Sequence, residues 1–132
     1  MIRKISYNSQ PEFEGSEFLK GKEHRWRVAV MIPGGRTDLP TMEYKGEGVD
    51  FRVAVQVASF WALLDLRHTH DKKLRNTVFR CHPSRPEGEP FSTFHDTEQE
   101  EDTTIIHMAR MMESMDDVYT LQEHESRREA LA

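Results

Sequence analysis

The stretch YKGEGVDFRVAVQVASFWALLDL, residues 44–66, decides the fold because the spacing of its apolar residues changes within it. Before Gly46 and Gly48 the pattern is that of a strand, and after them apolar side chains recur at helical intervals. Asp50 stands where a helix N-cap is expected, since its carboxylate can accept hydrogen bonds from the first free backbone N–H groups. We therefore predict a helix that begins near Asp50.

This helix is apolar around most of its circumference. Its one polar stripe is narrow and consists of Arg52, Gln56 and Ser59. Small residues at every fourth position form a line that allows close approach to a sheet, namely Ala54, Ala58 and Ala62. Trp61 and Leu64 lie away from this line and need a further partner. We expect the helix to be covered on more than one side.

Two strands are predicted before the helix. In WRVAVMI, residues 26–32, every second side chain is apolar and bulky, which is the period of a strand with one buried face. PGGRTDLP, residues 33–40, reads as a hairpin connection, and residues 41–45 return as a second strand. The paired glycines, here and at Gly46 and Gly48, lack the spacing of a nucleotide-binding loop and are interpreted as turn residues. No cofactor is expected.

The first 24 residues show no sustained period. We predict a short strand over residues 2–7 and a loop over the rest of this segment. After the long helix, TVFRCHP, residues 77–83, is a candidate short strand. Residues 87–102 form a proline-containing acidic linker.

A second amphipathic helix is predicted over residues 103–128. Its apolar side chains follow at steps of three and four residues: Ile105, Met108, Ala109, Met112, Met115 and Tyr119. Asp102, Thr103 or Thr104 can cap its N-terminus. This helix can pack on the first one or on a second chain.

The predicted fold class is α+β, with a small antiparallel sheet packed against a long helix and an additional C-terminal amphipathic helix. The 132 residues suffice for one core. We divide the chain into an N-terminal extension (1–24), a sheet-and-helix core (25–86), the acidic linker (87–102) and the C-terminal helix (103–132).

Composition favours a reducing compartment. Cys81 is the one cysteine, so no intrachain disulfide can form. The N-terminus lacks the apolar core of a signal peptide, and no stretch approaches the ~18 apolar residues needed to span a membrane. We expect a cytoplasmic or nuclear protein that does not enter a membrane.

Charge is distributed unevenly along the chain. Residues 1–86 carry 15 Lys and Arg against 10 Asp and Glu, while residues 87–132 carry 3 against 13. The basic excess is densest between Arg67 and Arg85, where Asp71 is the one acid. This segment could meet phosphate. The opposing interpretation is that the acidic run of residues 87–102 neutralises it within the chain.

Residues 26–67 resemble the second half of a double-stranded RNA-binding domain. The residues that carry the resemblance are GEG at 46–48, a capping residue, and the helical positions Arg52, Ala54, Gln56, Ala58, Ala62, Leu63 and Leu66. In that family the last strand runs through G-x-G into a helix patterned S-K-K-x-A-K-x-x-A-A-x-x-A-L. The resemblance implies two strands of a sheet and a helix whose lysines meet phosphates.

The sequence departs from the family at those lysines. The matching positions are Phe51, Arg52 and Val55, so one cation of three is present. The segment 33–40 offers Arg36 where the family's hairpin carries a histidine. Phosphate contacts dominate affinity for nucleic acid, so the surface implied by the resemblance is largely lost. A strand pair, a G-x-G helix and a terminal helix are also loosely similar to small uncharacterised plant proteins, which implies no activity.

The favoured interpretation is a non-catalytic module that binds a protein partner or a second copy of itself. Two apolar side chains replace lysines at the start of the helix, and methionines are adaptable contact residues. The predicted partner-binding residues are Phe51, Arg52, Val55, Met108, Met111 and Met115. The alternative is binding of double-stranded RNA, by Arg52, Arg67, Lys72, Lys73, Arg75 and Arg80.

Other site types find little support in the sequence. His68, His70, Cys81 and His82 lack the two close ligand pairs typical of zinc, so no metal site is expected. Cys81 has no activating arrangement and is interpreted as a small buried residue. No set of polar residues can be nominated for catalysis, and we expect no enzyme activity.

Overall fold

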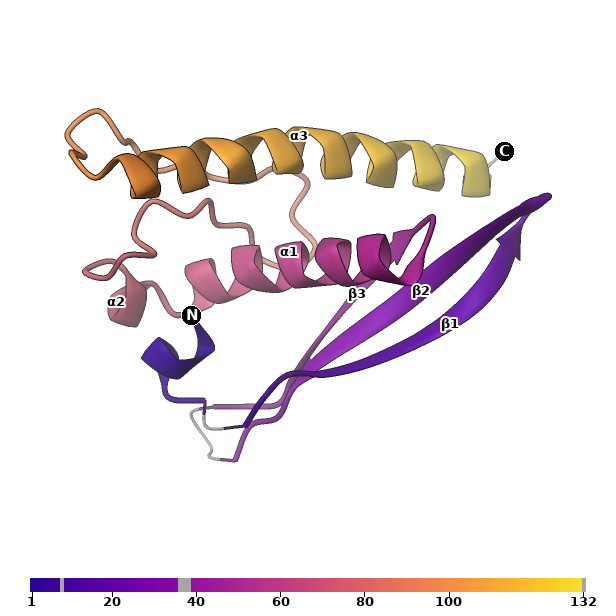
Figure 1. Ribbon diagram of the computed structural model, residues 1–132, viewed down its shortest axis with the longest axis horizontal. Coiled ribbons are helices and arrows are strands. Elements are labelled where there is room, and N and C mark those ends of the chain that lie inside the picture. Colours follow the sequence, from indigo (N-terminus) through magenta and orange to yellow (C-terminus); the bar gives the residue numbers. More distant parts are fainter. Residues whose placement is uncertain (8, 36–38, 132) are drawn as a thin grey trace. The chain divides into compact units, whose positions relative to one another are not determined.

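The computed structural model describes residues 1–7, 9–35 and 39–131, and it confirms the α+β class. Figure 1 shows its elements: a 3-10 helix Ile2–Ile5, β1 Glu12–Lys20, β2 Glu23–Ile32, β3 Met42–Gly48, α1 Phe51–Thr69, α2 Asp71–Leu74 and α3 Thr103–Leu131. The chain forms two compact units, Met1–Leu63 and Leu64–Ala132. The division between them falls within α1, and each unit is described by itself.

The sheet of the first unit is antiparallel, with the strand order β1-β2-β3. Gly21 and Lys22 connect β1 and β2 directly, and Gly21 has a φ of 66°. A glycine with positive φ at the first central position is typical of a type II′ turn, which matches the twist of the flanking strands. The pairing is one-to-one over the whole of β1, from Glu12 opposite Met31 to Lys20 opposite Glu23.

One face of the sheet holds the core of this unit. Val28, Val30 and Ile32 of β2 are buried, as their alternation predicts. Directly paired residues share a face of an antiparallel sheet, so Tyr44 of β3, opposite Val30, belongs to the same face and is also buried. The strand predicted over residues 26–32 is therefore confirmed, with three more residues at its start.

Helix α1 lies directly on β3. A Cβ atom added to Gly46 would lie 2.3 Å from the backbone nitrogen of Ala58, and one added to Gly48 would lie 2.7 Å from that of Ala54. The line of alanines thus approaches the sheet as predicted. The interpretation of Gly46 and Gly48 as turn residues is wrong, because both lie within β3 and make room for the helix backbone.

The second unit contains the end of α1, the short helix α2, an irregular segment of residues 75–102 and α3. The N-terminus of α3 is capped as predicted, since Asp102 Oδ1 accepts a hydrogen bond from the backbone N–H of Thr104 at 2.9 Å. Cys81 packs with Ile105 and Ala109 in a buried cluster. The irregular segment therefore contributes to the core of this unit.

Three predictions of secondary structure are wrong. Residues 12–20 form β1 where a loop was expected, residues 2–5 form a 3-10 helix where a strand was expected, and residues 77–83 form turns and a bend where a strand was expected. In the last segment the main chain is held by turn hydrogen bonds, such as Arg80 N–H to Thr77 O at 3.1 Å. Part of the connection at 33–40 lies outside the described residues.

Candidate interaction surfaces

Phe51 is the first residue of α1 and is held in a defined position. Asp50 Oδ1 accepts a hydrogen bond from the Val53 N–H at 2.8 Å and fixes the first turn. The Phe51 ring lies on Gly15 of β1, where an added Cβ would come within 2.7 Å of Phe51 Cε2. Its centroid is 5.5 Å from that of Trp26 in an edge-to-face contact. Phe51 nevertheless stays 44% exposed.

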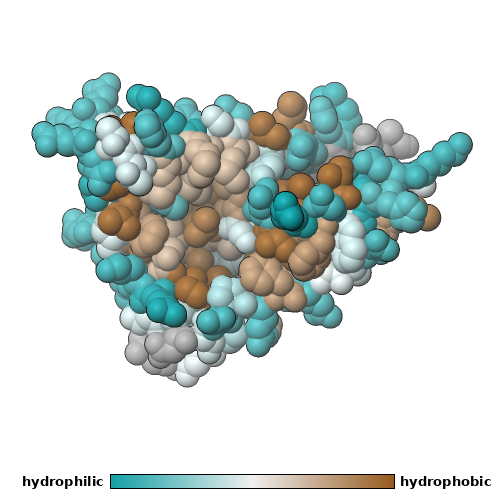
Figure 2. Space-filling model, in the orientation of Figure 1, coloured by the Kyte–Doolittle hydropathy of each residue, from teal (hydrophilic) through white to brown (hydrophobic). Residues whose placement is uncertain are grey.

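Further apolar side chains of the first unit are exposed around the start of α1. Val49 precedes the helix, and Phe13 and Leu19 lie on the face of β1 that carries Gly15. Figure 2 shows brown, hydrophobic residues over the first half of α1, bordered by teal, hydrophilic ones. We call Val49, Phe51 and Val55, together with Phe13 and Leu19, the α1 surface.

Val55 lies one helical turn beyond Phe51 and is half-buried. Helix α1 runs in the direction opposite to β3, because Gly48 faces Ala54 and Gly46 faces Ala58. Residues four apart are neighbours on a helix surface, so Phe51 and Val55 form an apolar strip along one side of the first turns of α1.

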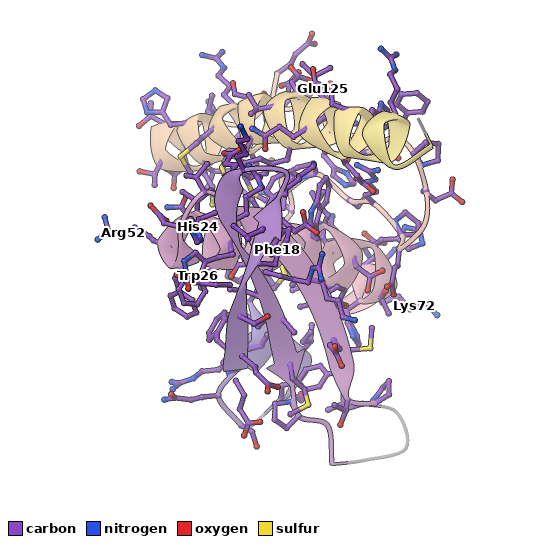
Figure 3. The ribbon with its side chains drawn as sticks, turned by 90° about the vertical axis from the view of Figure 1, so that its right-hand side faces the viewer. Phe18, His24, Trp26, Arg52, Lys72 and Glu125 are labelled. Atoms are coloured by element: carbon purple, nitrogen blue, oxygen red, sulfur yellow. The ribbon has the colours of Figure 1, made fainter. Side chains whose placement is uncertain are left out.

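Arg52 is exposed and carries the one positive charge in the first turn of α1. Figure 3 shows its side chain extending away from the sheet and the helix. Phe51, Arg52 and Val55 thus lie together in the first turns of α1.

The three predicted methionines lie on α3, in the second unit. Met111 is 59% exposed, and Val118 and Leu121 are exposed on the same helix. Met108 and Met115 are half-buried, and the Met108 sulfur lies 3.0 Å from Nε2 of His82. Met111 is therefore a surface residue, whereas Met108 also packs against the irregular segment. We call Met111, Met115, Val118 and Leu121 the α3 surface.

Arg67 and Arg80, two predicted nucleic-acid contacts, make internal contacts. The Arg67 side chain is 2% exposed; its Nη1 donates to Asp71 Oδ1 at 2.6 Å and its Nη2 to the Arg80 carbonyl at 3.1 Å. Arg80 pairs with Glu100 and also donates to Thr77 O. The neutralisation of the basic segment by the acidic run is confirmed for Arg80.

Arg85 joins the same segment to α3. It is buried, its Nη1 donates to Thr120 Oγ1 at 3.1 Å, and its Nη2 lies 3.5 Å from a carboxylate oxygen of Glu123. Its Nε also donates to Glu89 O at 2.6 Å. The arginines of this segment thus hold the second unit together. Besides Arg52, the exposed cations of the predicted set are Lys72, Lys73 and Arg75, at and after α2. Figure 3 shows Lys72 pointing outward.

His82 and Cys81 are buried side by side in the chain. Burial, and next the charge of Arg67, lowers the pKa of His82 from 6.5 to about 4, so its ring is neutral at pH 7. Burial raises the pKa of the Cys81 thiol, which makes it a poor nucleophile. Within the ranges that the structure describes, no three His, Cys, Asp or Glu side chains gather as metal ligands would.

Comparisons give this chain no relatives. No protein-family model, no curated protein and no solved structure matches it. Across the described part of the chain, no helix combines the length and apolar character needed to cross a membrane.

The sequence did not reveal that Phe13 and Leu19 belong to the α1 surface or that Gly15 supports Phe51, because β1 itself was not predicted. One signal was present. Gly21 stands between two lysines at the centre of the hairpin, and a glycine followed by a polar residue between two strand-like runs is a turn signal.

Proposed function

We propose that this protein is a non-catalytic interaction module that binds a protein partner through exposed apolar side chains. The observation that carries the proposal is the placement of Phe51. Its ring is fixed by Gly15 and Trp26 and still offers 44% of its surface to solvent. A rigid aromatic side chain that is already oriented loses little conformational entropy on binding, which is the property of an interface anchor.

The neighbourhood of Phe51 supports a protein partner. Val49, Leu19 and Phe13 are exposed apolar residues of the same unit, and Arg52 adds a charged rim. An apolar centre with a polar rim is the usual composition of a protein–protein interface. We infer that the α1 surface receives an apolar side chain or helix face of the partner.

The resemblance to the double-stranded RNA-binding domain supports the same proposal by contrast. The positions that correspond to the family's lysines are Phe51, Arg52 and Val55, and two of these are apolar here. The exchange removes phosphate contacts and supplies a surface that water solvates poorly. A domain of this type can keep its scaffold while its ligand changes.

The α3 surface is a second candidate contact of the same kind. Met111, Val118 and Leu121 are exposed on one helix, and methionine side chains adapt to differently shaped partners. Since the two surfaces belong to different units, we treat them as separate contacts and test each alone.

The α1 surface is tested by adding charge. Val49→Glu and Val55→Glu should each abolish binding of the partner or of a second copy, while the exposed Gln56→Glu on the same helix should not. The measurement is size-exclusion chromatography with light scattering, together with affinity capture by the purified chain. If Val49→Glu and Gln56→Glu behave alike, the α1 surface is not the binding site.

The α3 surface has its own matched variants. Met111→Glu combined with Met115→Glu should remove a contact made through α3, and the exposed His124→Glu, on the side of the helix opposite the two methionines, serves as the control. A complex that survives the double substitution with unchanged affinity excludes this surface.

The alternative function, binding of double-stranded RNA, is favoured by one observation. Three exposed cations lie close together in the chain: Lys72 and Lys73 in α2, and Arg75 directly after it. It predicts that the chain shifts a duplex of ~16 base pairs, with steep salt dependence, and that Lys72→Glu with Lys73→Glu weakens the shift. The absence of any shift at low salt would exclude this function.

A further inference from the structure

We propose that β1 pairs edge to edge with β1 of a second copy of the chain, joining the two three-stranded sheets into one. The strands would run antiparallel about a two-fold axis at Ser16. This surface is the main-chain edge of β1, so the proposal does not depend on the function proposed above.

β1 is an edge strand: among the strands that the structure describes, only β2 pairs with it. It pairs on one side with β2 and is the first strand of the sheet (Figure 1). From Glu12 to Ser16 every residue is exposed, and so are Glu17 and Leu19. Such a strand presents a row of N–H and C=O groups that can continue a sheet.

The hairpin determines which of these groups point outward. Lys20 and Glu23 flank the two-residue turn and therefore exchange hydrogen bonds with each other. The direction of the main-chain groups alternates along a strand, so the even-numbered residues of β1 face β2. The groups that face outward belong to Phe13, Gly15, Glu17 and Leu19, and for none of them does the described chain supply a main-chain partner on that side.

Two features that commonly prevent edge pairing are absent from β1. It contains no proline, and its one-to-one register with β2 leaves no bulge. β3, at the opposite edge, differs: three of its seven residues are buried, including both glycines that contact α1. β1 is also longer, with nine residues. The pairing edge is therefore β1.

Full overlap of two antiparallel β1 strands gives a complementary register. Phe13 of each copy stands opposite Leu19 of the other, and Gly15 opposite Glu17. These are the residues whose main-chain groups point outward, so each such pair exchanges two hydrogen bonds. Their side chains share the face on which Phe51 covers Gly15. Apolar residues thus meet apolar residues across the new ladder.

The charges of β1 are compatible with this register and with few others. Glu12 of one strand stands opposite Lys20 of the other at both ends, and Glu14 stands opposite Phe18. No carboxylate lies directly opposite another. Sliding the strands by two residues, so that the two Glu17 side chains face each other, would oppose like charges and is disfavoured. The two Glu17 residues are diagonal neighbours, roughly 7–8 Å apart in such a ladder.

The decisive variant blocks one outward N–H. Glu17→Pro removes that donor and leaves the hydrogen bonds to β2 intact, because proline is tolerated at the open side of an edge strand. Each dimer loses two hydrogen bonds, so its dissociation constant should rise about 10- to 100-fold. Glu17→Ala is the matched control; it keeps the N–H, relieves the diagonal repulsion and should leave the dimer equal or tighter.

The measurement is the oligomeric state by sedimentation and light scattering, over roughly 1 to 500 µM of the full chain. Leu19→Asp, at an exposed position, gives a second variant that does not depend on proline and should also yield monomers. Because Leu19 also belongs to the α1 surface, this result supports edge pairing only where Val49→Glu leaves the dimer intact. Amide exchange adds an independent readout: raising the concentration should protect Phe13, Gly15, Glu17 and Leu19, while Glu14, Ser16 and Phe18 are protected at every concentration.

The outcomes separate this proposal from others. A chain that stays monomeric over the whole range overturns it, as does a dimer that Glu17→Pro and Leu19→Asp leave unchanged. A dimer lost with Val49→Glu but kept with Glu17→Pro assigns self-association to the α1 surface and overturns the edge pairing.

Discussion

The close approach of α1 to β3 predicts a large effect of a single methyl group. In Gly46→Ala the new Cβ would lie 2.3 Å from the Ala58 nitrogen, 2.8 Å from the Ala54 oxygen and 2.9 Å from the Ala58 Cα. Ordinary contact begins at 3.4 Å, so the shortest distance falls short by more than 1 Å. All three atoms are backbone atoms, which no rotamer change can move. The helix itself must shift away from β3.

We expect Gly46→Ala to lower the free energy of unfolding by about 3 kcal/mol, the upper range for overpacking in a core. The measurement is urea denaturation followed by circular dichroism, with a fall in melting temperature of roughly 10 °C as a second readout. Gly35→Ala is the control, because an added Cβ there meets nothing within 4 Å. If both variants unfold at the same urea concentration, the close approach of α1 to β3 is wrong.

Three further predictions concern the cap, the buried arginine and the buried histidine. Asp50→Ala removes the N-cap of α1 and should lower the free energy of unfolding by about 1 kcal/mol in the same assay. Asp50→Ser keeps a capping oxygen and should retain most of that free energy. The hydrogen bond from Arg67 holds the pKa of Asp71 below its usual range. Arg67→Met should therefore raise the pKa of Asp71, which NMR titration measures. An unchanged pKa would mean that Arg67 does not contact Asp71. The pKa of His82 is about 4 in the folded chain and 6.5, the ordinary value, in the unfolded chain. As the pH falls, the unfolded chain therefore binds a proton at this ring first. The free energy of unfolding should fall by roughly 3 kcal/mol between pH 6.5 and pH 4. His82→Leu should flatten that slope; an equal slope in both proteins contradicts the assignment.

The elements that the sequence predicted correctly are those whose buried side chains recur at a regular interval. The alternation of β2 and the helical spacing of α1 and α3 follow the burial of their side chains, and burial is what periodicity records. The cap at Asp50 was predictable because it depends on one side chain and the adjacent backbone. The apolar strip of Phe51 and Val55 followed from the same helical spacing.

The elements that were missed take their positions from distant partners. β1 is exposed on both faces along most of its length, so its sequence EFEGSEFLK carries no apolar alternation. Residues 77–83 contain β-branched and aromatic residues, yet the Arg67 side chain binds their main chain from α1. Spacing along the chain does not reveal such a contact.

The buried arginines should make one part of residues 75–102 more resistant to proteases than the rest. Cys81 to Arg85 are buried in succession, and Arg85 is tied to α3. A protease must extract some ten residues of extended chain, and that extraction would break these contacts. The first cuts between α2 and α3 should therefore fall at residues 87–91, which are exposed, and the fragments should stay associated until denaturant separates them.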